Sequence, residues 1–167
     1  MKLVIYDNNP GPGLGNAGLR LSWKVWAWKQ LQTKECDAVF AANSWFDAVS
    51  WALKHESITW IQYWGHGSDG AVYCGDKALK PTDLALLKGK LKPEAYIWFR
   101  SCFTFKSTWG RDFARSVRKH TGVKVAGHTK LIGLTQPGLQ VLRVTGDVDW
   151  NDAEGKSIWC FQSKLPE

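Results

Sequence analysis

Short apolar runs alternate along the chain with longer segments that mix apolar and polar residues. The apolar runs cover residues 3–6, 37–41, 58–64, 95–100 and 123–127. Runs of this length are typical of buried strands. The longer segments, which we expect to be helices, are residues 17–33, residues 44–55, a segment that opens at Pro81 and residues 110–120. Strands that alternate with helices predict right-handed crossovers and a mostly parallel sheet with helices on both faces, a three-layer α/β sandwich.

Local signals support several of these boundaries. Residues 8–18 are rich in Gly and Pro and are expected to form a loop. Ser44 with Asp47 three residues later resembles a capping box at a helix start. Thr121-Gly122 is a typical helix end. These signals place loops between the predicted strands and helices.

The tail departs from the alternating plan. Residues 131–135, the turn Gln136-Pro137-Gly138 and residues 139–146 predict a β-hairpin, and residues 157–162 predict one more strand. Residues 71–74 predict a smaller hairpin. At 167 residues and 44% hydrophobic content, the chain is long enough for one well-buried domain and short for two. We expect a single domain with a core of about residues 1–127 and a β extension of about residues 128–167.

Charge and hydropathy narrow the possible settings. The net charge is +7 and the pI is about 9.3, but basic residues are scattered among acidic ones, so nucleic acid is not an expected partner. The N-terminal apolar run stops at Asp7, which does not fit a signal peptide. No apolar stretch approaches the roughly 20 residues of a membrane span. We expect a soluble cytoplasmic protein.

The four Cys residues are expected to be separate thiols. They stand at positions 36, 74, 102 and 160 without a C-x-x-C pair, so neither a zinc site nor a disulfide framework is expected. Cys36 and Cys160 lie in apolar patterns and are expected to be packing residues. The Gly-rich loop lacks the spacing and the Lys of a phosphate-binding loop. We therefore expect neither a metal nor a cofactor.

Two strand ends carry the candidate chemistry. Residues 58–64 run into Gly65-His66-Gly67, and residues 95–99 run into Arg100-Ser101-Cys102. The carboxyl ends of parallel strands lie along one sheet edge, so His66 and Cys102 are expected to meet there. A thiolate is the reactive form of Cys, and a nearby imidazole can take the thiol proton or pair with the thiolate.

This arrangement of elements, with His-Gly after the third strand and Ser101-Cys102 after the fourth, resembles the caspase-like cysteine peptidases, which include caspases, metacaspases, legumains, gingipains and clostripain. The resemblance covers about residues 1–127. The Arg-Gly that follows the caspase nucleophile is missing after Cys102. The chain is therefore similar to a divergent bacterial or phage-type relative rather than to a true caspase.

The resemblance implies a role for each matching residue. Cys102 matches the nucleophile, His66 matches the general acid/base, and Gly67 with the amide of Cys102 matches the oxyanion hole. Arg100 and Ser101 are expected to contact the substrate. Basic-specific relatives carry Asp at the position of Arg100, so Arg100 implies a preference for an acidic residue before the scissile bond. The alternative is that the Arg100 side chain points away from the cleft and pairs with a surface acid.

Two functional interpretations stay open. The first is a cysteine peptidase, and the second is a catalytically silent binding module of the same fold with a protein or nucleic-acid partner. In the helix at 17–33, apolar residues form two stripes: Leu19, Trp23 and Trp26, and Leu21, Val25 and Trp28. This excess indicates either a partner, which can be a second copy, or a thick local core.

Overall fold

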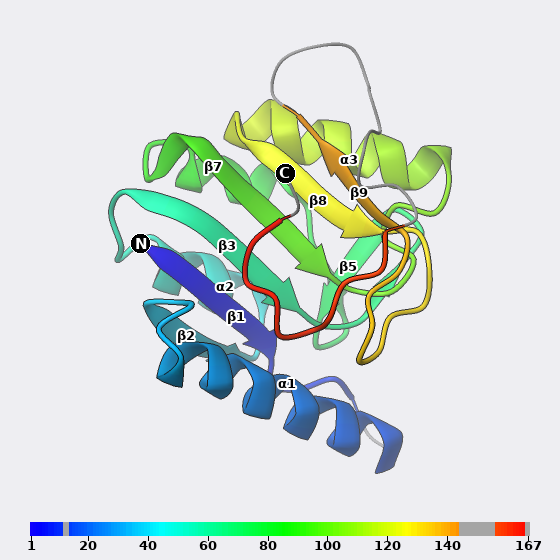
Figure 1. Cartoon of the computed structure of the whole chain (residues 1–167). Coiled ribbons are helices and arrows are strands. Elements are labelled where there is room, and N and C mark those ends of the chain that lie inside the picture. Colours follow the sequence, from blue (N-terminus) through cyan, green and yellow to red (C-terminus); the bar gives the residue numbers. More distant parts are fainter. Residues whose placement is uncertain (12–13, 144–155, 166–167) are drawn as a thin grey trace.

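The structure is a computed structural model that describes residues 1–11, 14–143 and 156–165. Six strands form one sheet in the order β2-β1-β3-β7-β8-β9 (Figure 1). Their bounds are Lys2–Asp7 for β1, Ala38–Ala42 for β2, Ile58–Trp64 for β3, Leu91–Arg100 for β7, Lys124–His128 for β8 and Leu139–Leu142 for β9. Neighbouring strands pair in parallel except that β9 runs antiparallel to β8. The predicted mostly parallel sheet is confirmed.

A small antiparallel sheet follows β3. It consists of β4 (Gly67–Ser68), β5 (Ala71–Cys74) and β6 (Lys77–Ala78) in that order. The predicted hairpin at residues 71–74 is thus part of a three-stranded sheet that begins directly after His66. This sheet forms one wall beside the carboxyl end of β3.

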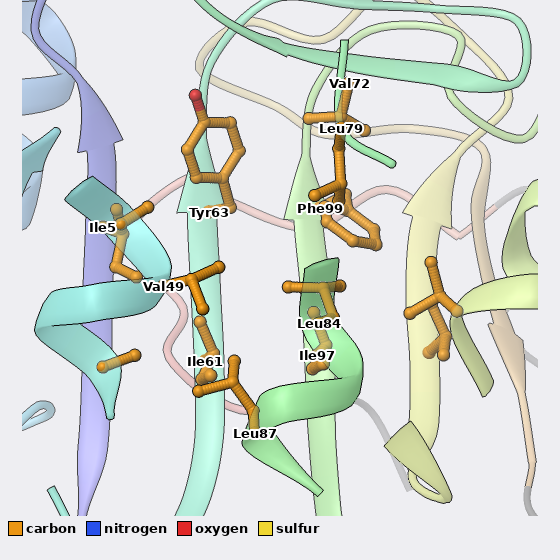
Figure 2. Packing of buried hydrophobic residues seen from close by; sticks show 14 of the residues in the cluster. Ile5, Val49, Ile61, Tyr63, Val72, Leu79, Leu84, Leu87, Ile97 and Phe99 are labelled. Atoms are coloured by element: carbon orange, nitrogen blue, oxygen red, sulfur yellow. The ribbon is translucent and has the colours of Figure 1, made fainter. Parts of the chain in front are cut away.

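Three helical segments cover one face of the large sheet. They are α2 (Trp45–Ala52), the 3-10 helix η1 (Pro81–Leu87) and α3 (Thr108–Thr121). Their apolar residues pack with alternate strand residues such as Ile61 and Ile97 in the main core (Figure 2). The alternation of side chains along each strand sends the residues between them to the other face. The site is therefore built on strands whose two faces are both buried.

The opposite face is covered by α1 (Leu14–Gln32) and by the C-terminal segment at residues 156–165 (Figure 1). Trp23 of α1 packs in one cluster with Trp60 and Trp64 of β3. The C-terminal segment crosses β3 and β7, where the Ser163 carbonyl accepts hydrogen bonds from Gln62 Nε2 at 2.7 Å and from Tyr96 OH at 2.9 Å. A helix and an extended strap thus complete the second outer layer.

The predicted capping signals are confirmed. The Ser44 hydroxyl accepts a hydrogen bond from the Asp47 amide at 3.1 Å at the start of α2. Gly122 ends α3 with a φ of 77°, in the left-handed region that glycine tolerates. The start of α2 and the end of α3 therefore coincide with the predicted signals.

Some predicted elements differ from the structure. Helix α1 begins at Leu14 inside the predicted loop, and the segment after Pro81 is a short 3-10 helix. Residues 131–135 and 157–162 form no strand but meet at an isolated bridge between Thr135 and Trp159. The predicted hairpin is wrong because β9 pairs with β8, and all four β9 residues are thereby buried between the two outer layers. A free hairpin would leave one of its faces in water. Residues 144–146 of that prediction lie outside the described residues.

Helix α1 carries apolar residues on both its inner and outer sides. Trp23 is 8% exposed and Ala27 is fully buried against the sheet. Leu21, Val25 and Trp28 form an outer stripe and are 62%, 50% and 61% exposed. A thick local core explains the buried Trp23 and Ala27, but it does not explain the exposed outer stripe. Contact of this stripe with a partner stays a prediction. Of the helices in the described ranges, none is long and apolar enough to cross a membrane.

Candidate active site

The candidate site lies where β3 and β7 end. Trp64 and Arg100, the last residues of these strands, are direct partners in the parallel ladder. His66 and Cys102 each follow two residues later. Neighbouring strands lie about 4.8 Å apart, so the two loops leave the sheet side by side. The structure thus brings the His66 and Cys102 loops together, as the topology predicted.

Gly67 is the point of closest approach between these loops. A Cβ atom added to Gly67 would lie 2.6 Å from the Cys102 carbonyl oxygen and 2.7 Å from both Ser101 Cβ and Thr104 Oγ1. Real Cβ atoms essentially never lie this close to another heavy atom. Only glycine therefore lets the chain after His66 lie directly against the turn that carries Cys102.

The Gly67 peptide is oriented by the small antiparallel sheet. The Tyr73 amide donates to the His66 carbonyl at 2.9 Å, and Gly67 lies opposite Val72. In an antiparallel ladder, a hydrogen bond between the residues next to a facing pair identifies that pair as non-hydrogen-bonded. The amides of such a pair, here Gly67 and Val72, point away from each other's strand. The Gly67 amide is therefore directed away from β5. In this orientation the Gly67 N–H is not used by β5 and can donate a hydrogen bond to an oxygen atom of a bound substrate.

The turn after β7 holds an unfavourable backbone conformation. Phe103, directly after Cys102, has a φ of 57°. A left-handed non-glycine residue costs on the order of 1–3 kcal/mol and persists where the surroundings enforce it. Here the Phe103 amide donates to the Lys130 carbonyl at 3.1 Å, and the Phe105 amide donates to the His128 carbonyl at 3.0 Å. Hydrogen bonds to β8 and its following loop thus fix the turn that presents Cys102.

Phe105 anchors the same turn in the core. A Cβ on Gly127 of β8 would lie 2.8 Å from the Phe105 ring, and a Cβ on Gly110 of α3 would lie 2.5 Å from the Phe105 Cα. Phe105 is 1% exposed. The turn is therefore clamped between β8 and α3, which leaves the position of Cys102 little freedom.

The side chains of His66 and Cys102 are half-buried, and they are not hydrogen-bonded to each other. The His66 ring contacts the buried ring of Trp23 edge-on, with 5.4 Å between the ring centres. The Cys102 thiol donates to the Ile132 carbonyl over a long 3.9 Å. No hydrogen bond joins imidazole and thiol within the described part of the chain. Catalytic hydrogen bonds are often long in free enzymes and tighten when substrate binds.

Cys102 differs from the other three thiols in exposure. Cys36, Cys74 and Cys160 are buried, whereas Cys102 is intermediate. Burial raises the pKa of Cys36 to about 11 and that of Cys74 to about 12, and it also raises the pKa of Cys160. Such thiols are poor nucleophiles at neutral pH. The predicted packing role of Cys36 and Cys160 agrees with their burial.

Arg100 does not line an open pocket. Its side chain is 1% exposed and lies over the rings of Trp98 and Trp64, at 3.9 Å and 4.7 Å from the ring centres. Its guanidinium donates to the carbonyls of Cys160 and Gln162 in the C-terminal segment. Burial lowers its pKa to about 9. The Arg100 side chain is therefore not placed to contact a substrate carboxylate. The alternative agrees with the structure in that the side chain is buried away from solvent, but its partners are backbone carbonyls of the C-terminal segment rather than a surface acid.

Ser101 is also buried. Its side chain is fully inaccessible and lies beneath Gly67. Its hydroxyl has no hydrogen-bond partner among the described residues. Because Ser101 is fully buried, its side chain is not placed to contact a substrate. Ser101 serves as a small residue at a tight contact.

Sequence reasoning missed the surroundings of the two side chains. A polar cavity of about 180 Å³ lies at the carboxyl end of β1, lined by Asn8, Asn9, Pro10, Gly11, Asn16, Ala17 and Arg20. Arg20 stands one helical turn before Trp23, which contacts His66. Two exposed apolar residues adjoin the Cys102 turn: Trp109 in the first turn of α3, and Leu131 between Lys130 and Ile132, whose carbonyls accept from Phe103 and Cys102. The Asn-rich loop after the first strand was the available signal for the cavity.

No group of His, Cys, Asp and Glu residues within the described ranges has the arrangement of a metal site. No family model and no curated protein matches the chain. What the structure defines is a mixed α/β fold in which a His loop and a Cys turn meet at the carboxyl edge of a mostly parallel sheet.

Proposed function

We propose that the protein is a cysteine peptidase of the caspase-like type, with Cys102 as nucleophile and His66 as general acid/base. One observation carries the proposal: the main chain of Gly67 lies directly against the Cys102 turn, so the His66 loop and the Cys102 turn form one unit. The partial exposure of Cys102 beside three buried thiols supports the same assignment. The resemblance of the His66-Gly67 and Ser101-Cys102 motifs to that family supports it independently.

The proposed reaction has two stages. The Cys102 thiolate attacks the carbonyl carbon of the scissile peptide bond, and the resulting oxyanion accepts hydrogen bonds from the amides of Gly67 and Cys102. The His66 imidazolium gives its proton to the leaving amine as the C–N bond breaks, which leaves a thioester on Cys102. His66 then takes a proton from water as it attacks the thioester, and the proton returns to the thiol with release of the carboxylic acid.

The substrate is proposed to be a protein or peptide that lies across the carboxyl edge of the sheet. Exposed Trp109 and Leu131 provide apolar surface next to the Cys102 turn. The polar cavity at the end of β1 is proposed to receive a polar side chain of the substrate. These features replace Arg100 and Ser101 as the candidates for substrate contact.

The direct test is hydrolysis of a mixed peptide library by the native protein, Cys102→Ala and His66→Ala. The proposal predicts cleavage by the native protein alone. Asp76→Ala is a suitable control, because Asp76 is exposed and its only described ion pair is with its neighbour Lys77. Cleavage by a folded Cys102→Ala protein at the rate of the native protein would rule out Cys102 as the nucleophile.

The second candidate function is a catalytically silent binding module of the same fold. The observation that favours it is the outer stripe of α1, where Leu21, Val25 and Trp28 expose apolar surface of the kind found at protein contacts. A thiol probe separates the two functions. A peptidase requires that labelling of Cys102 depend on His66, whereas a binding module does not.

A further inference from the structure

A carboxylate links the two loops of the candidate site. The Ser107 amide donates to Asp69 Oδ1 at 3.0 Å, and the Ser107 hydroxyl donates to Asp69 Oδ2. Asp69 lies three residues after His66, and Ser107 lies five residues after Cys102. The two residues are separated by 38 positions in the chain. The contact therefore ties the segment that follows the base to the segment that follows the nucleophile.

A second contact runs parallel to the first. The Gly70 amide donates to the Thr104 carbonyl at 3.1 Å. The Thr104 hydroxyl in turn donates to the Ser101 carbonyl at 3.2 Å. A Cβ on Gly70 would lie 3.1 Å from the Trp109 carbonyl oxygen, so the His loop also packs on the first turn of α3. The connection thus reaches from Asp69 and Gly70 back to the residue before Cys102.

The link is electrostatic as well as geometric. Ser107 is the N-cap of α3, and its hydroxyl accepts a hydrogen bond from the Trp109 amide at 3.2 Å. Asp69 adds a negative charge at the same helix N-terminus, where the helix dipole favours it. Hydrogen bonds from an amide and a hydroxyl to a carboxylate are stronger than those between neutral groups. The His loop is therefore held to α3 by a charge-assisted pair of bonds.

Helix capping alone does not require this arrangement. Ser107 already caps α3 from within its own segment. Asp69 comes from a different loop, and the hydrogen bonds of its carboxylate in the described structure go to Ser107 rather than to His66. The effect of Asp69 is thus to set where the His66 loop lies relative to the Cys102 turn.

We propose that Asp69 is a positioning residue that, through Ser107, fixes the separation of the His66 imidazole and the Cys102 thiol. This inference rests on the proposed peptidase function. Asp69 does not touch the substrate and does not take the proton of His66. It holds the loop so that the imidazole stays within reach of the thiol during turnover.

The test compares steady-state kinetics of Asp69→Ala, Ser107→Ala and the double variant. A displacement of about 1 Å can cost on the order of 100-fold in rate. We expect each single variant to lower kcat by about 10- to 100-fold with KM nearly unchanged, and the double variant to lose little more than either single one. Ser107→Thr, which keeps the hydroxyl, is expected to retain most of kcat. Asp76→Ala on the same hairpin region is the matched control.

A second readout separates positioning from simple loss of stability. The alkylation rate of Cys102 by iodoacetamide is followed against pH in the native protein, in Asp69→Ala and in Asp69→Asn. Positioning predicts that both variants slow the alkylation of Cys102 across the pH range while circular dichroism stays native. Asp69→Asn keeps the size of the side chain, so it decides the matter if Asp69→Ala does not fold.

The outcomes are distinct. An unchanged kcat in folded Asp69→Ala and Asp69→Asn would overturn the positioning role, as would losses that add in the double variant or a rise in KM alone. A native protein without hydrolysis, together with a Cys102 profile that does not depend on His66, would instead remove the proposed function and this role with it.

Discussion

Gly67→Ala is the smallest change that bears on the contact between the two loops. The added methyl group would lie 2.6 Å from the Cys102 carbonyl oxygen, whereas ordinary van der Waals contact begins at 3.4 Å. Because that oxygen and Ser101 Cβ are fixed by the backbone, the loops must separate by about 1 Å. Overpacking of this kind costs about 1–3 kcal/mol of folding stability. The variant should fold with a lowered Tm.

The loss of activity should be much larger than the loss of stability suggests. Removing one oxyanion donor costs on the order of 100- to 1,000-fold in kcat. Gly67→Ala moves such a donor without deleting it, so we expect kcat/KM to fall by at least about 100-fold. The assay is hydrolysis of a cleaved library peptide, with Tm measured on the same samples. Gly133→Ala is the matched control, because a Cβ at Gly133 meets nothing within 4 Å.

A folded Gly67→Ala protein with activity within about 3-fold of the native protein would refute this reasoning. It would mean either that the loops adapt without cost or that the Gly67 amide does not face the reacting carbonyl. Loss of activity in Gly133→Ala of the same size would also count against it, since that position has open space.

Further predictions concern thiol reactivity and acid stability. Iodoacetamide should label Cys102 at least about 10-fold faster than the other three Cys residues of the native protein, because burial raises the pKa of those thiols. The labelling rates are followed by mass spectrometry of peptides. Equal rates for all four thiols would contradict the proposed site. His128 is fully buried between Trp98 and the Pro137 carbonyl, and burial lowers its pKa from 6.5 to about 3. Between about pH 6.5 and pH 3, His128 binds a proton in the unfolded chain but stays neutral in the folded chain. The free energy of unfolding should therefore fall as the pH drops from about 6.5 toward 3. Urea unfolding at pH 7 and pH 4.5 should show an extra loss of about 2–3 kcal/mol in the native protein relative to His128→Gln, and parallel curves would refute a neutral buried imidazole.

The strands of the sheet were predictable because both of their faces are buried. Residues 58–64 and 95–100 are mostly apolar runs, and each lies in a strand of the structure, β3 and β7, although β7 begins earlier, at Leu91. The meeting of His66 and Cys102 loops followed from the same fact, since parallel strands that pair in sequence order share a carboxyl edge. The local hydrophobic pattern was sufficient to predict the strands, and the parallel direction of these strands was sufficient to predict that the His66 and Cys102 loops meet.

Contacts between distant segments could not be predicted in this way. The direction of the Arg100 side chain alternates with that of its neighbours, but what covers that face is the C-terminal segment, 60 residues further along the chain. The same holds for the 38-residue separation of Asp69 and Ser107. A local pattern carries no signal for which backbone carbonyl or hydroxyl a buried charge will meet.

The polar cavity illustrates a second limit. Asn8, Asn16 and Arg20 stand in a Gly/Pro-rich loop and the first turns of α1, and each is unremarkable in its local pattern. They line one space only because α1 starts at Leu14, earlier than the predicted boundary. Helix ends are the least determined part of a periodic pattern. The Asn-rich loop was visible in the sequence, but the space that it lines depends on where α1 begins and could not be predicted from it.

The proposed function requires that Cys102 and His66 hydrolyse peptide bonds together. The most direct measurement is cleavage of a mixed peptide library, read by mass spectrometry, for the native protein, Cys102→Ala and His66→Ala at equal concentration, with circular dichroism to verify each fold. We expect defined cleavage products from the native protein and a loss of at least about 1,000-fold in rate for either variant, because removing either member of a catalytic unit removes most of its activity. Undiminished cleavage by folded Cys102→Ala, or a native protein that cleaves no library peptide and shows no fast-reacting thiol, would contradict it.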